Sequence, residues 1–139
     1  MNKLYVFGLC GLAVLFGAVP NVFAMPKFKN AFEKKYVEQH PSAEFKALAK
    51  KEACNVCHVK GEKKDVRNAY GEALAKLIEG DAQQRIKDAG ANKQAEEEKI
   101  LQELEEAFKK TEEQKVNEED ASSPTFGELI KQGKLPSGD

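Results

Sequence analysis

The chain has 139 residues, of which 22 are basic and 23 acidic, and its formal net charge is −1 at pH 7. A chain of this length suits one small domain. Nucleic-acid binding is not indicated, because it requires a clear excess of basic side chains. The near balance of charge also argues against a strongly single-signed surface for membrane binding.

The N-terminus has the layout of a secretory signal peptide. Lys3 precedes an apolar run over 4–19, and Pro20 and residues 22–24 follow as a helix breaker and a cleavage point. The run is short for a membrane span, which takes roughly 20 residues. We expect residues 1–24 to be removed, so that the mature chain acts in the periplasm or an equivalent compartment without stable membrane insertion. The alternative is an uncleaved anchor.

Two helices are predicted in the next part of the chain. The first covers 28–39, where aromatic side chains recur every four residues and Pro41 stops the helix. Its repeating positions are Phe28, Phe32 and Tyr36. The second covers 43–53, with Ser42 as its N-cap.

The sequence "CNVCH" at residues 54–58 carries the most distinctive chemistry. Without residues 1–24 the chain keeps two cysteines, Cys54 and Cys57, with His58 directly behind them. In an exported protein such a pair can form a disulfide, and C-x-x-C also occurs in redox motifs and zinc sites. C-x-x-C-H is the covalent attachment site of c-type haem, in which two thiols add to the porphyrin vinyl groups and the histidine ligates the iron. We favour haem, with a disulfide or zinc as the alternatives.

Four more helices are predicted after the motif, at 69–79, 81–89, 93–115 and 125–132. Asn68 and Asp81 can act as N-caps, and Gly80 and Gly90 can end helices. A polar loop over 116–124 precedes the last helix. No segment alternates with period two, so we expect an all-α fold.

Helices of these lengths would form a thin core on their own. A covalently bound haem would add an apolar plate for side chains to pack against, in a small cytochrome c-like helical domain over residues 25–139. The expected packing residues are Phe28, Phe32, Tyr36, Phe45, Leu74 and Leu77. We expect the chain without haem to be marginally stable, because a group bound by the native state stabilises it.

Three stretches resemble one family, the small exported mono-haem c-type cytochromes of the planctomycete type. They are "KFKNAFEKKYVEQHPSAEFKALAKKEAC" (27–54), "CNVCHVKGEKKDVRNAYGEAL" (54–74) and "SPTFGELIKQGKLPSG" (123–138). The resemblance is weakest over 81–115. It implies an exported, helical haem domain that carries electrons, with Cys54 and Cys57 as thioether anchors and His58 as the proximal ligand.

The sixth iron ligand stays open at this stage. Class I cytochromes place a methionine well downstream of the motif, whereas this mature chain has only Met25, so the first candidate is Met25 or the new N-terminus. His40 is a second candidate for a distal ligand, although a histidine beside Pro41 is commonly a solvent-exposed turn residue. An open site is the third alternative. The choice matters because axial ligands move the reduction potential across about 0.8 V.

Five residues after the motif have two interpretations each. Lys63, Lys64 and Arg67 can pair with haem propionates, or form a solvated cluster or a docking patch for an acidic redox partner. Tyr70 can contact the haem edge or pack in the core. Gly71 can allow the backbone to approach the haem, or relieve a crowded helix contact.

Electron transfer to and from a redox protein partner is therefore the expected function, and catalysis is not expected. The chain has no Ser-His-Asp set and no glycine-rich phosphate loop. An open iron site would favour a second function, as a haem-based sensor of NO or CO or a peroxidase-like enzyme. A third hypothesis is a subunit of a larger respiratory complex; association with itself or with another chain is left open.

Overall fold

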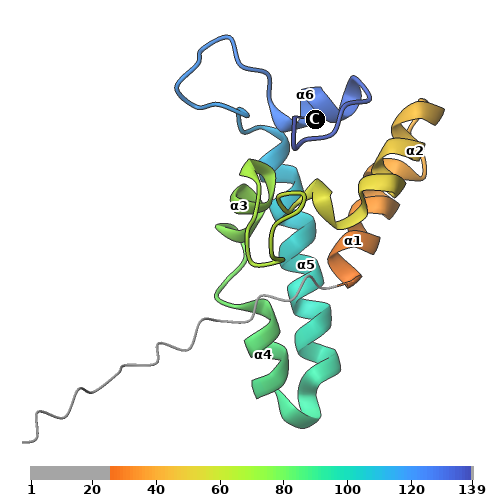
Figure 1. Cartoon of the computed structure of the whole chain (residues 1–139). Helices are drawn as coiled ribbons and strands as arrows, with labels where there is room; N and C mark the ends of the chain where they lie inside the picture. The colour runs from red at the N-terminus through yellow and green to blue at the C-terminus, as the bar shows by residue number, and fades with distance from the viewer. Residues whose placement is uncertain (1–25, 139) are drawn as a thin grey trace, which may run out of the picture.

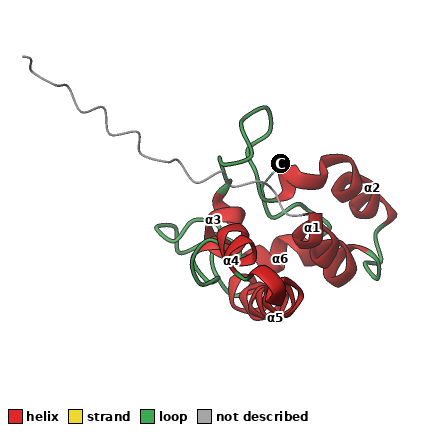
Figure 2. Ribbon diagram, turned by 90° about the horizontal axis from the view of Figure 1, so that it is seen from below, coloured by secondary structure: helices red, strands yellow, loops and turns green. Residues whose placement is uncertain are grey.

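The computed structural model describes residues 26–138, so the predicted signal peptide and Met25 lie outside the described part. Over these residues the chain folds into helices joined by loops and turns, and it forms no strand beyond two isolated bridges (Figure 2). The prediction of an all-α fold is confirmed. None of the helices described here combines the length and apolar character that crossing a bilayer requires.

The α-helices are α1 (Pro26–Phe32), α2 (Ala43–Glu52), α3 (Ala69–Ala75), α4 (Ala82–Asp88), α5 (Lys93–Glu112) and α6 (Phe126–Lys131). Short segments of other helix types are η1 (Glu33–Val37, a π-helix), η2 (Ala53–Val56, 3₁₀) and η3 (Gly90–Asn92, 3₁₀). The long α5 runs through the middle, with α1 and α2 on one side and α3 on the other (Figure 1). It contacts α1, α3, α4 and α6, so α5 is the common support of the fold.

Three predicted helices are shorter than expected at their C-terminal ends. The first continues from α1 into η1 but ends at Val37, and α3 ends at Ala75. The longest helix ends at Glu112 because the backbone beyond it finds other partners: Gln114 O accepts from Phe126 N at 3.0 Å, and Val116 N donates to Pro124 O at 3.0 Å. The loop between α5 and α6 is thus pinned at both ends.

Three predicted helix starts are confirmed by the N-caps that were expected there, whereas α1 already includes Pro26 and Lys27, ahead of the predicted start at Phe28. Ser42 accepts a hydrogen bond from Phe45 N at 3.1 Å, and Asp81 accepts one from Gln84 N at 2.8 Å. Thr125 and Glu128 form a reciprocal capping box at the start of α6. These polar side chains satisfy amide groups that the first turn of a helix leaves without partners.

An aromatic cluster joins the two sides of the fold. The ring of Phe32 lies 6.3 Å from Phe108 on α5 and 6.0 Å from Tyr70 on α3, in edge-on arrangements. Tyr70 lies 5.3 Å from Phe126 at the start of α6. All four residues are buried, and such edge-on pairs add about 1 kcal/mol each beyond the burial of their area. The cluster fixes α1 and α3 against the same stretch of α5.

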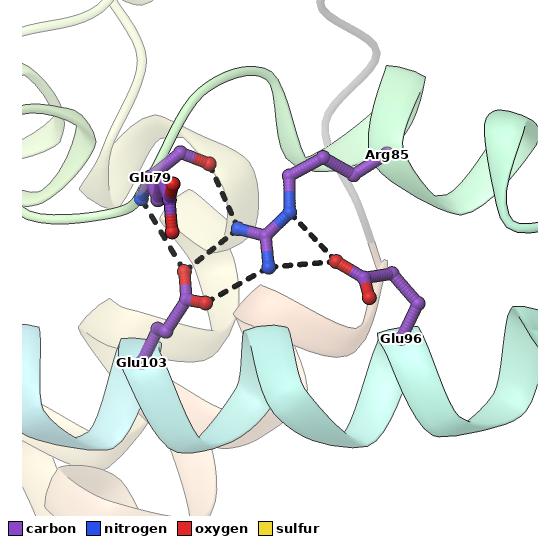
Figure 3. A network of polar contacts seen from close by, with 4 residues as sticks. All are labelled: Glu79, Arg85, Glu96 and Glu103. Carbon is purple, nitrogen blue, oxygen red and sulfur yellow. Dashed lines mark hydrogen bonds and ion pairs between the residues drawn. The ribbon is translucent and has the colours of Figure 1, made fainter.

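A polar network holds α4 on the first half of α5 (Figure 3). The guanidinium of Arg85 makes two parallel bonds to the carboxylate of Glu103, at 2.7 and 2.8 Å, and a third to Glu96 at 2.7 Å. It also donates to the carbonyl of Glu79 at 2.8 Å. The hydrogen bonds that Arg85 donates to Glu103 lower the pKa of Glu103 and raise the pKa of Arg85. A bidentate, partly buried pair of this kind is worth more than an exposed ion pair.

Replacing Arg85 by methionine should lower the free energy of unfolding by about 1 to 2 kcal/mol at pH 7. The pKa of Glu103 is lowered in the folded state, so the stability it contributes is present above about pH 4.3 and is lost as the pH falls through its lower folded-state value. The difference between Arg85→Met and wild type should therefore shrink at pH 3. Urea unfolding followed by circular dichroism at the two pH values measures this.

Lys87→Met, on the exposed side of the same helix, is the matched control and should change stability little. Equal losses for Arg85→Met at pH 7 and pH 3 would contradict the assigned role of the network.

Candidate functional site

The motif residues lie on one tight turn at the end of α2. The carbonyl of Cys54 accepts hydrogen bonds from Cys57 N at 3.2 Å and from His58 N at 3.1 Å. Ala53, at the start of this turn, has a positive φ of 49°, which an alanine rarely adopts. The turn therefore brings two thiols and an imidazole close together, at the cost of a strained backbone at Ala53.

Asn68 fastens this turn to α3. Its side-chain oxygen caps α3 by accepting from Gly71 N at 2.9 Å, and its side-chain nitrogen donates to the carbonyls of Asn55 and Val56 at 3.1 and 3.0 Å. Its backbone N–H donates to the carbonyl of Cys57 at 3.1 Å. The sequence analysis predicted the cap but missed the three bonds to the motif. One residue thus fixes α3 and three carbonyls of the motif at the same time.

Gly71 packs directly on the motif. A Cβ at this position would lie 2.0 Å from the carbonyl oxygen of Cys57 and 3.2 Å from Cβ of Arg67. No side chain fits in that space. Of the two interpretations of Gly71, the structure agrees with the crowded helix contact, because the first turn of α3 lies against the backbone of Cys57.

The motif opens into a cavity between α1, α3 and the start of α4. The cavity has a volume of about 140 Å³ and is partly open to solvent. Its lining is mainly apolar and includes Phe28, Phe32, Ala49, Val56, Leu74 and Ile78. Cys54, Cys57 and His58 all line it, so the structure places the three predicted attachment residues around one apolar space.

Burial controls the protonation of the motif. It raises the pKa of the Cys57 thiol to about 12, with the neighbouring Cys54 adding to the effect and Arg67 opposing it. In a reactive C-x-x-C dithiol the pKa of a cysteine thiol is lowered, so the raised pKa of Cys57 does not favour a redox motif. The pKa of His58 is lowered, mainly by burial and then by the charge of Lys64, so the ring favours the neutral form. Its Nδ1 is buried and has no hydrogen-bond partner. Both cysteines are free thiols.

Of the four residues predicted to contact propionates or the haem edge, the structure brings one to the cavity. Arg67 lines it and lies 3.7 Å from a carboxylate oxygen of Glu72. Lys63 and Lys64 are exposed and lie outside the lining. Tyr70 is 1% exposed and packs between Phe32 and Phe126, which agrees with its alternative role in the core.

The structure does not bring His40 to this cavity. Its Nδ1 accepts from Ser42 N at 3.1 Å, so its Nε2 carries the proton and donates to the carbonyl of Ile130 at 2.9 Å. The ring also packs on Phe45, with centroids 4.3 Å apart. His40 ties the start of α2 to α6 in this structure, and both its ring nitrogens are engaged; its role as a distal ligand finds no support in this geometry.

The expected haem-packing residues are likewise divided. Phe28, Phe32 and Leu74 line the cavity, whereas Tyr36, Phe45 and Leu77 lie outside its lining. Tyr36 instead donates a hydrogen bond to Glu112 on α5 at 2.5 Å.

Besides Arg67, three charged residues in the described part of the chain line the cavity without having been predicted to do so: Lys29, Glu33 and Asp81. Lys29 and Glu33 line the cavity beside Phe28 and Phe32 and form an ion pair at 3.0 Å. Each lies one position after an aromatic residue of the four-residue repeat. A helix face broader than the aromatic stripe would have included them.

The comparisons with known proteins add no relative: no protein-family model, no curated protein and no solved structure matches this chain. Within residues 26–138, no three His, Cys, Asp or Glu side chains are grouped so that they could hold a metal ion.

Asn68→Asp separates the two tasks of Asn68. The carboxylate keeps the cap on α3 but cannot donate to Asn55 and Val56, so we expect a loss of about 2 kcal/mol in the free energy of unfolding. Asn68→Ala loses the cap as well and should cost about 3 kcal/mol. Chemical denaturation measures both. Asp81→Asn is the control, because the Asp81 side chain only accepts a hydrogen bond at its cap, and it should change the free energy of unfolding very little. If Asn68→Asp also left the free energy of unfolding almost unchanged, the bonds from Asn68 to the motif would be contradicted.

Gly71→Ala should lower the free energy of unfolding by about 3 kcal/mol, because the methyl group would collide with the Cys57 carbonyl. Gly61→Ala is the matched comparison. Gly61 has a φ of +83° but open space around it, so only backbone strain of about 1 kcal/mol is expected. Thermal unfolding of the two variants tests this, and equal stabilities would rule out the close contact.

Proposed function

We propose that this chain is a c-type haem protein that carries single electrons outside the cytoplasmic membrane. The observation that carries the proposal is the convergence of Cys54, Cys57 and His58 on one mainly apolar cavity. Bound there, a haem would supply a one-electron couple between Fe(III) and Fe(II). Cys54 and Cys57 would hold it through thioether links, and His58 would be its proximal ligand.

The chemistry of the residues fits this group better than the alternatives. A disulfide would leave the apolar cavity unexplained. A zinc site normally takes four ligands, whereas among residues 26–138 no three His, Cys, Asp or Glu side chains are grouped so that they could hold a metal ion. Thioether formation adds each S–H bond across a vinyl C=C double bond, which requires both cysteines to be free thiols, as they are here. A neutral imidazole has the lone pair that an iron ligand needs.

The fold suits a carrier because it holds the attachment residues rigidly. The bonds from Asn68 and the contact at Gly71 fix the backbone of the motif, so little would rearrange when the charge on the iron changes. The exposed Lys63 and Lys64 follow the motif in sequence and suit docking of an acidic redox protein. We propose that the chain acts in the same way as the planctomycete-type cytochromes that its sequence resembles.

A second candidate function is a haem that binds NO or CO. It is favoured by the cavity lining, which contains no methionine and no histidine other than His58 among the described residues. The same lining would suit a carrier if another side chain supplied the sixth ligand.

Mass spectrometry of the protein, expressed in a host that attaches c-type haem, tests the proposal. The chain should gain the mass of one haem and keep it after denaturation, because the links are covalent. Cys54→Ser and Cys57→Ser should each retain the haem less firmly, and the double variant should lose it on denaturation. Ser123→Ala, in the distant loop before α6, should retain it like wild type. A wild-type mass without haem would refute the proposal.

A further inference from the structure

Among residues 26–138, Lys29 is the one amine in the lining of the cavity. It lies on α1, between Phe28 and the wall residues Phe32 and Glu33, whereas Cys54, Cys57 and His58 belong to the turn after α2. Its side chain is 35% exposed, so part of it faces solvent and part faces the protein. A flexible four-carbon stem lets the amine swing inward.

The other polar side chains of the lining are poorer ligands for haem iron. Arg67 offers no lone pair. Glu33 and Asp81 are hard oxygen donors, which suit ions such as Mg²⁺ or Ca²⁺, and Asp81 already caps α4. Gln83 offers a neutral amide, a weak donor compared with an amine. An amine would bind iron through nitrogen, which is also the donor atom of the proximal imidazole.

The present partner of Lys29 is easily given up. Its amine pairs with Glu33 at 3.0 Å, four residues further along the same helix. Both side chains are partly exposed, and such i,i+4 pairs contribute only about 0.3 to 0.5 kcal/mol. Breaking this ion pair therefore costs little compared with the free energy that a bond from the amine to iron would provide.

We propose that the amine of Lys29 is the sixth ligand of the haem iron. The ammonium loses one proton to solvent and its nitrogen forms a bond to iron, with no change in oxidation state. The inference rests on the proposed function, since it needs a haem held by the motif. Ligation by Lys29 would leave no open position on the iron, which favours the electron carrier over the protein that binds NO or CO.

The test uses visible absorption spectra of the haem-loaded protein, with and without CO, on wild type and three variants. Wild type should be low-spin, and its reduced spectrum should not change with CO. Lys29→Ala should become high-spin and bind CO. Lys34→Ala, exposed on the adjoining η1 and outside the cavity lining, should behave as wild type, as should His40→Ala. Circular dichroism checks that each variant is folded.

A low-spin spectrum in Lys29→Ala, a high-spin wild type, or a switch to high spin in His40→Ala would each overturn the assignment of Lys29 while leaving the proposed function intact. Mass spectrometry on the same samples separates these outcomes from failure of the function itself. If wild type carries no haem, both the function and the ligand are refuted.

Discussion

The carbonyl of Cys57 is the point on which the arrangement of the site depends. It accepts a hydrogen bond from Asn68 N at 3.1 Å, and the first turn of α3 lies against it with no room for a side chain at Gly71. A shift of α3 would break the bond or close the contact. The turn that carries the cysteines and His58 therefore keeps a fixed position relative to α3, and Leu74 and Ile78, further along the chain, become cavity wall.

The opposite wall is held by different interactions, and this keeps the cavity open. Phe32 fixes α1 against α5 and α3, and Tyr36 adds a hydrogen bond to Glu112 at 2.5 Å. At the other end, Arg85 holds α4 on α5 through Glu96 and Glu103. Because α5 supports both walls, neither α1 nor α4 can collapse into the space without losing these contacts.

Local sequence signals predicted what local physics decides. Helix starts follow from caps such as Asp81, whose bonds join neighbouring residues, and these were confirmed. Helix ends were placed too late because they depend on distant partners, as in the bond between Phe126 N and Gln114 O. The motif was visible in the sequence, but the contact between Gly71 and the Cys57 carbonyl depends on how α3 packs against the motif, which no periodicity encodes.

Under the proposed function, the contrast between His40 and Lys29 would make residue type alone a poor guide to the sixth iron ligand. Histidine is the better ligand by type, but His40 already uses Nδ1 to accept and Nε2 to donate, at 3.1 and 2.9 Å. Moving it to iron would cost both bonds and its packing on Phe45. Lys29 starts from a weak ion pair and already lines the cavity. The free energy of ligation depends on what a side chain must leave as well as on what it binds, and by that measure the lysine is the better placed of the two.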